Sequence, residues 1–189
     1  SGHWYSALCL PSLSQTNWPS WRGPTGNGTA PEKCKPPIEW SEEKNIIWKK
    51  KLPGLGHSTP VIWGNKVFIT STIPFGERKD PPVSDNAPGS HDNDPVSQMH
   101  RFIVLCMDRI SGKVLWQTAV SDYVIHQGFG TSPTVYRDVV IAKADSKKIG
   151  GAVAGLNKKT GKVIWKINRP KYPNYTTPVM ITAYGKLQM

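Results

Sequence analysis

Short apolar runs separated by turn-forming residues make up most of the chain. Valine, isoleucine and threonine dominate these runs, and glycine, asparagine, aspartate or proline stands at their ends. Such runs are typical of β-strands joined by tight turns. No stretch of convincing length repeats its apolar residues with the period of a helix. Pro60, Pro133 and Pro178 each stand where a run begins, a position at which a strand tolerates the missing N–H. The pattern predicts an all-β chain.

Two stretches of the chain, residues 107–116 and 156–165, are near copies of each other. In each, an Asp or Asn precedes a Gly-Lys pair, two branched apolar residues and a Trp. A second shared block, which begins with Ser or Thr before a Pro, occurs at residues 58–70, 131–142 and 175–187. The spacing of the two copies is close to the period of about 40 to 50 residues expected for a four-stranded propeller blade. The chain is therefore predicted to be a tandem array of small antiparallel sheets.

The repeated motif favours a structural role over a ligand-binding one. Gly permits the positive φ of a tight hairpin turn, and Asp or Asn can accept hydrogen bonds from its own turn. The flat indole can pack over a neighbouring sheet while its N–H finds an acceptor. The residues concerned are Asp108, Gly112, Lys113 and Trp116 in the first copy and Asn157, Gly161, Lys162 and Trp165 in the second.

Residues 74–99 interrupt the strand pattern. They contain five prolines, two glycines and four aspartates, and they show no apolar periodicity. Such a composition predicts a long loop inserted between two strands of one blade. Asp85, His91, Asp92, Asn93 and Asp94 could offer donors to calcium. Their spacing does not match a calcium-binding loop, so a solvated loop is favoured.

The repeat resembles the pyrroloquinoline-quinone-like (PQQ-like) β-propeller family, whose motif has the form Ala-x-Asp-x-x-Thr-Gly-Lys-x-x-Trp. Cys106 and Gly155 stand near the Ala position, and Ser111 and Asn157 depart from Thr and Asp. The opening of residues 17–24, Asn-Trp-Pro-Ser-Trp-Arg-Gly-Pro, is similar to bacterial envelope members of the outer-membrane protein assembly factor type. The resemblance implies a PQQ/quinoprotein-like propeller of eight blades when complete. It also implies that each motif Trp docks one blade against the next.

The resemblance covers residues 17–189, about two and a half blades. The expected parts are a Trp-ended strand at 46–51, a blade at 58–119 that carries the inserted loop 74–99, a second blade at 131–168 and the start of a further blade at 175–189. Residues 1–16 are expected to be a signal-peptide remnant or disordered. Because propellers generally close a ring of four to eight blades, we expect the chain to pack against further C-terminal blades of its own protein.

The composition excludes several classes of protein and assigns the chain to none. The net charge is +11, but the 24 basic residues are scattered over predicted turns and strand edges without a recognisable nucleic-acid module. This distribution favours a solvated surface, with contact to anionic envelope surfaces as an alternative. The cysteines Cys9, Cys34 and Cys106 are too few and too dispersed for a disulfide framework or a zinc site. No run is long enough to span a membrane.

The resemblance leaves two functions open. The favoured one is a non-catalytic interaction or assembly scaffold, periplasmic or secreted in the bacterial envelope, which binds other envelope proteins and no cofactor. The alternative is the N-terminal part of a PQQ- and calcium-dependent quinoprotein dehydrogenase acting on alcohols or sugars. That class is expected to carry an adjacent Cys pair, and this chain has none. His57 and His126 could line the mouth of a central channel, although capping of turns is favoured.

Overall fold

The computed structural model describes residues 17–32, 34–79, 97–124, 130–146, 149–172 and 174–189. Within these ranges the structure consists of strands and connecting loops, and the all-β prediction is confirmed. Sheet I contains β1 (Val61–Trp63), β2 (Lys66–Lys79), β3 (Ser97–Asp108) and β4 (Val114–Val124). Sheet II contains β5 (Thr134–Tyr136), β6 (Val139–Ala144), β7 (Gly151–Asn157) and β8 (Val163–Arg169). A hairpin of β9 (Ile181–Ala183) and β10 (Lys186–Gln188) follows.

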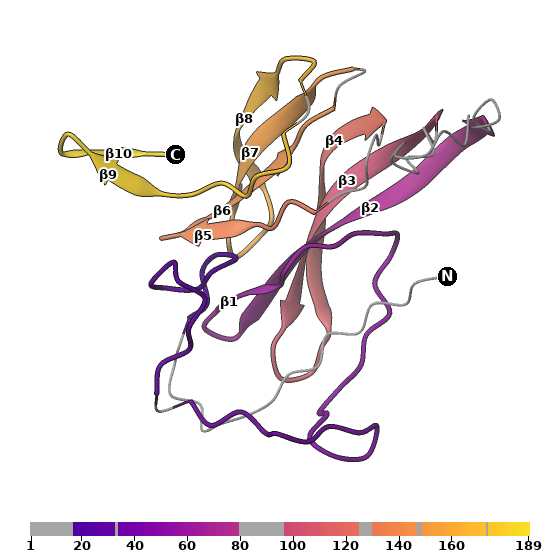
Figure 1. Cartoon of the computed structure of the whole chain (residues 1–189). Coiled ribbons are helices and arrows are strands. Elements are labelled where there is room, and N and C mark those ends of the chain that lie inside the picture. Colours follow the sequence, from indigo (N-terminus) through magenta and orange to yellow (C-terminus); the bar gives the residue numbers. More distant parts are fainter. Residues whose placement is uncertain (1–16, 33, 80–96, 125–129, 147–148, 173) are drawn as a thin grey trace, which may run out of the picture.

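Both sheets are antiparallel meanders in which each strand pairs with its neighbour in the sequence. Figure 1 shows the two sheets side by side, with the β9–β10 hairpin extending away from sheet II. In three hairpins the first residue of the two-residue turn has positive φ: Gly64 (57°), Arg137 (52°) and Tyr184 (51°). A left-handed residue matches the twist of the paired strands in a two-residue turn. The three hairpins are therefore equivalent parts of successive repeats.

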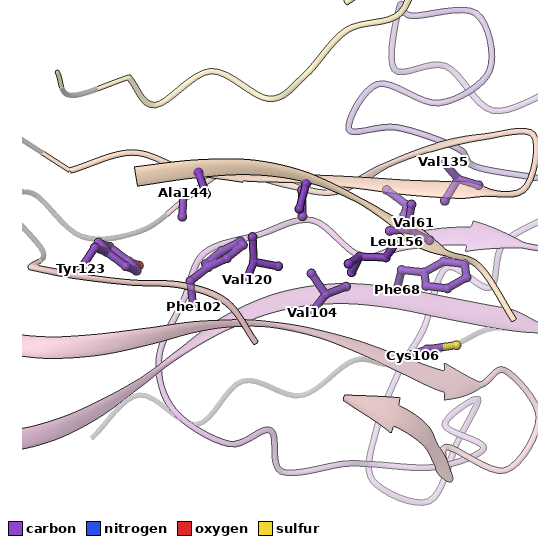
Figure 2. Packing of buried hydrophobic residues seen from close by; sticks show 14 residues of the cluster. Val61, Phe68, Phe102, Val104, Cys106, Val120, Tyr123, Val135, Ala144 and Leu156 are labelled. Carbon is purple, nitrogen blue, oxygen red and sulfur yellow. The ribbon is translucent and has the colours of Figure 1, made fainter. Parts of the chain in front are cut away.

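The main hydrophobic core lies between the two sheets. On β3, the side chains of Phe102, Val104 and Cys106 are completely buried and face sheet II. They meet β6 and β7, which present small residues such as Ala142 and Ala154. Figure 2 shows side chains of the two sheets pointing toward one another across this layer. Large residues on one sheet and small residues on the other allow the two layers to approach closely.

The opposite face of sheet I has a second core. Because side chains alternate along a strand, Ile103, Leu105 and Met107 point away from sheet II. Trp48 and Leu52, from the segment that precedes β1, pack against them. This segment thus covers one face of sheet I, as sheet II covers the other.

The N-terminal segment also ties the two sheets together at their first strands. Trp18 forms an antiparallel bridge with Ile62 of β1, with N···O distances of 2.8 and 2.9 Å. The next residue, Pro19, accepts a hydrogen bond of 2.7 Å from the backbone N–H of Val135 in β5. Residues 17–19 therefore connect the innermost strand of each sheet.

The structure differs from the sequence prediction at two boundaries. Residues 46–51, predicted as a Trp-ended strand, form no strand; Trp48 reaches its packing position from an extended segment. The predicted loop 74–99 is shorter, because Pro74–Lys79 belongs to β2 and Ser97–Met99 to β3. Backbone pairing extends the ladder here despite the few apolar residues, aided by Arg101, whose guanidinium lies 5.0 Å from the ring of Phe75.

Other predictions concern residues outside the described ranges or are adjusted only slightly. The proposed signal-peptide remnant at 1–16, the candidate calcium donors of residues 85–94 and His126 lie outside the described residues. Strand β4 continues to Val124, past the predicted end of the first blade at residue 119. In the described part of the chain, no helix has the length and apolar character needed to cross a membrane.

The close approach of the two sheets predicts that sheet II tolerates no larger residue at its centre. Ala154→Leu would force extra methyl groups into a fully buried position, and we expect a loss of about 1–3 kcal/mol in the free energy of unfolding. The matched control is Ala119→Leu, because Ala119 is exposed on β4 and should accept leucine within about 0.5 kcal/mol. Urea unfolding of both variants measures the difference. Equal losses would contradict this description of the core.

Candidate functional site

The first copy of the repeated motif forms a compact turn around Asp108. One carboxylate oxygen of Asp108 accepts hydrogen bonds from the Ser111 N–H (2.8 Å), the Ser111 hydroxyl (2.8 Å) and the Ile110 N–H (3.1 Å). The Ser111 groups, which stabilise the charged form, hold the pKa of Asp108 below its usual value. Gly112, at the end of the turn, has a φ of 67° and donates its N–H to the Asp108 carbonyl. The backbone of Lys113 closes the hairpin while its side chain is exposed.

The second copy repeats this geometry with an amide in place of the carboxylate. The side-chain oxygen of Asn157 accepts hydrogen bonds from the N–H groups of Lys159 (2.9 Å) and Thr160 (3.1 Å). Gly161 again has positive φ, 74°, and the Lys162 carbonyl again accepts the N–H of the first turn residue. A neutral Asn thus serves in this turn because the bonds that matter are accepted by one oxygen.

Each of these turns is covered by a tryptophan from the preceding part of the chain. A Cβ atom on Gly112 would lie 2.7 Å from the ring of Trp48, and one on Gly161 would lie 2.6 Å from the ring of Trp116. The indole N–H of Trp48 donates to the Arg109 carbonyl (2.9 Å). The indole N–H of Trp116 donates to the carbonyl of Lys158 (3.4 Å). Trp116 of sheet I therefore packs directly on Gly161 of sheet II. Its ring lies so close that no side chain could be accommodated at position 161.

The remaining motif tryptophan makes its contact within its own sheet. Trp165 on β8 lies opposite Gly155 on β7, where a Cβ atom would come within 2.3 Å of the indole. Cys106 occupies the corresponding place opposite Trp116 on sheet I. Burial raises the pKa of the Cys106 thiol to about 12, so this cysteine is a protonated core residue at neutral pH. The repeated motif thus forms packing and turn contacts.

The inner edge of the repeats carries a second series of contacts, which the sequence analysis did not identify. The residue before each strand-start proline is Thr59, Ser132 or Thr177. The backbone N–H of Thr59 donates to the Ser132 hydroxyl (2.9 Å), and the N–H of Ser132 donates to the Thr177 hydroxyl (3.2 Å). Each repeat is therefore connected to the next by the same hydrogen bond. The sequence feature that indicates these contacts is the Ser or Thr that precedes the proline in each repeat.

These residues lie in a groove, here called the inner groove, with a volume of about 1360 Å³. Its walls are residues 19–26, His57 and Thr59 ahead of β1, the start of β5, and residues 174–182. The described lining contains the cation Arg22, whose guanidinium lies 4.7 Å from the ring of Trp21, and it contains no Asp or Glu. His57 is among the residues that line the groove.

A buried ionic cluster supports the far wall of the inner groove. Lys143 on β6 is 7% exposed, and its Nζ lies 2.9 Å from the Asn174 side-chain oxygen and 3.3 Å from the Thr176 hydroxyl. Its Nζ also lies 3.5 Å from the carboxylate of Asp145, which in turn pairs with Arg169 at 3.2 Å. Burial lowers the pKa of Lys143, and the Asp145 charge opposes that shift. The cluster therefore fixes residues 174–176 against sheet II.

The groove does not fit the calcium site that a PQQ enzyme would require. Calcium takes six to eight oxygen ligands, with carboxylates prominent among them. The described lining residues offer hydroxyl, amide and carbonyl oxygens without a carboxylate. Among all described residues, no group of three or more His, Cys, Asp or Glu side chains could hold a metal ion. No step of a reaction is therefore assigned to the groove.

Comparisons with known proteins address the family. A family model described as outer membrane protein assembly factor BamB matches residues 78–188. No curated protein matches the chain. Among solved structures, a europium-containing methanol dehydrogenase is similar at 15% identity and a TM-score of 0.33 over 61% of this chain. The match spans 25% of that enzyme.

The Trp-on-Gly contact predicts a strong and specific response to alanine. Gly161→Ala must place a methyl group against the Trp116 ring at a φ of 74°, and we expect it to lower the free energy of unfolding by about 2–4 kcal/mol. Gly64→Ala is the matched control, because Gly64 also has positive φ but no atom within 4 Å of the added carbon. It should cost about 1–2 kcal/mol, the conformational part alone. Chemical denaturation compares the two; a smaller loss at Gly161 than at Gly64 would refute the contact.

Proposed function

This chain belongs to the outer membrane protein assembly factor BamB family of PQQ-like propellers, and from that premise we propose that it is a non-catalytic scaffold of the bacterial envelope that binds extended segments of other envelope proteins in the inner groove. The family match, which covers residues 78–188, supports an envelope role and the assembly of outer membrane proteins as the process served. The groove itself supports the mode of binding.

The observation that carries this proposal is the size and lining of the inner groove. Pockets for small ligands usually measure about 300–1,000 Å³, and this groove is larger, at about 1360 Å³. Its lining mixes short hydroxyl side chains with aromatic and proline surfaces. Hydroxyl and backbone groups can hydrogen-bond a peptide main chain, and aromatic surfaces accept its side chains. A peptide of several residues fits this description better than a compact substrate.

The N-terminal turn supplies an aromatic anchor at the rim of the groove. Trp21 is 51% exposed, although a large aromatic ring gains most when it is buried. Arg22 lies over this ring and leaves its own guanidinium beside the groove. Trp and Arg are the residue types that contribute most to binding energy when a partner covers them. The rim therefore has the composition of a contact site for another chain.

The test uses a labelled peptide and two tryptophan variants. A fluorescein-labelled nonapeptide alternates valine and threonine around a central phenylalanine, as in a strand of an outer membrane barrel, and has a free carboxyl terminus. We expect Trp21→Ala to weaken its binding by about tenfold, measured by fluorescence anisotropy. Trp40→Ala is the control, since Trp40 is similarly exposed at 56% and lies outside the groove.

Either of two outcomes would contradict the proposal. One is the absence of binding by the unchanged protein. The other is an equal effect of the two tryptophan substitutions, which would place the peptide elsewhere. Oxidation of alcohols by the protein with added PQQ and calcium would support the dehydrogenase instead.

A further inference from the structure

Three side chains that line the inner groove, those of Asn174, Ser132 and Thr177, accept hydrogen bonds from other groups of the protein. The lining hydroxyls of Ser20, Thr25 and Thr134 instead donate theirs. The side-chain oxygen of Asn174 accepts hydrogen bonds from Lys143 Nζ (2.9 Å), the Thr176 N–H (3.0 Å) and the Thr176 hydroxyl (2.7 Å). An ammonium and a backbone N–H can only donate, so this atom of Asn174 must be the oxygen. What Asn174 can offer a ligand in the groove is its NH₂ group, which hydrogen-bonds to no described residue.

The hydroxyls of Ser132 and Thr177 at the inner edge also accept hydrogen bonds within the protein and can donate to a ligand. Ser132 Oγ accepts the Thr59 N–H, and Thr177 Oγ1 accepts the Ser132 N–H. Each hydroxyl keeps a proton to donate, and neither proton is donated to another described residue. Ser132 is only 2% exposed and lies among the lining residues, so it forms part of the groove floor. A ligand that reaches this floor meets O–H donors.

The charged residues around the groove also favour an anionic ligand. Arg22 lies at the rim, and no Asp or Glu is among the described lining residues. Behind the wall, Asp145 is paired with both Lys143 and Arg169, so this cluster has two positive charges and one negative charge. Donors aimed at a partly desolvated site bind an anion more strongly than they bind a neutral acceptor.

We propose that the inner groove selects a carboxylate group of the bound peptide, held by the Asn174 amide, the hydroxyls of Ser132 and Thr177, and the guanidinium of Arg22. This inference rests on the proposed function, because it names the chemical group by which the groove recognises its peptide. The groove thereby distinguishes acidic or carboxyl-terminal segments from neutral ones. The carboxylate of a chain terminus and that of an Asp side chain supply the same chemistry.

The first measurement changes the peptide and leaves the protein unaltered. Three forms of the nonapeptide are compared: the free acid, the carboxyl-terminal amide, and an amide in which the last residue is Asp. We expect the free acid to bind about tenfold or more tightly than the amide, because a charge-assisted hydrogen-bond network is lost on amidation. Terminal Asp restores binding if a side-chain carboxylate reaches the floor, and its failure to do so assigns the site to the chain terminus.

The second measurement replaces the side-chain amide of Asn174, in the groove wall, with a carboxylate. Asn174→Asp keeps an oxygen for Lys143 and Thr176 and replaces the NH₂ donor with a second carboxylate oxygen. We expect it to weaken binding of the free acid by about tenfold or more, with little effect on the amide. Asn168→Asp makes the same charge change on the exposed face of β8 and should leave both affinities within about twofold. Thermal unfolding of each variant verifies that the fold persists.

The outcomes separate this inference from the proposed function. Equal affinity of the free acid and the amide overturns carboxylate selection while leaving peptide binding in place. Equal effects of Asn174→Asp and Asn168→Asp overturn the assignment to Asn174. Binding of none of the three peptides overturns the proposed function, and carboxylate selection with it.

Discussion

The contact of an indole ring with a glycine in the following turn is the interaction on which the rest of this structure depends. In the part of the chain that the structure describes, this contact joins Trp48 to Gly112 and Trp116 to Gly161. In each case, the indole N–H is satisfied by a carbonyl of the same turn. Because the indole is held both by shape and by a directional bond, it fixes the position and the orientation of one repeat relative to the next.

The tryptophan contacts lie at the outer part of the sheets, and the inner groove lies at their first strands. The hydrogen bonds from Thr59 to Ser132 and from Ser132 to Thr177 connect successive repeats at their first strands. These bonds use the hydroxyl oxygens of Ser132 and Thr177 as acceptors and leave their O–H groups as donors at the groove. The same sequence repeat therefore produces two different results, a close-packed layer between the sheets and the inner groove.

The turns and the sheets could be predicted from the sequence because their causes are local. Asp108 and Asn157 accept hydrogen bonds from residues two and three positions away, and each glycine adopts its positive φ within the same turn. The sequence predicts a strand at Trp48 because its surroundings resemble those of the other motif tryptophans, yet packing and the indole hydrogen bond hold it in place without strand pairing. The inner groove could not be predicted, since residues 19–26 and 174–182 meet only when the repeats are assembled.

The central claim, that Trp116 and Gly161 hold sheet I and sheet II together by direct contact, is tested most directly by a double-mutant cycle in the free energy of unfolding. The four proteins are the unchanged chain, Trp116→Ala, Gly161→Ala and the double variant. If the indole is what excludes a side chain at Gly161, alanine there should cost at least about 1 kcal/mol less once the indole has been removed. Additive losses, within about 0.5 kcal/mol, would contradict the account, because they would show that the two residues act independently.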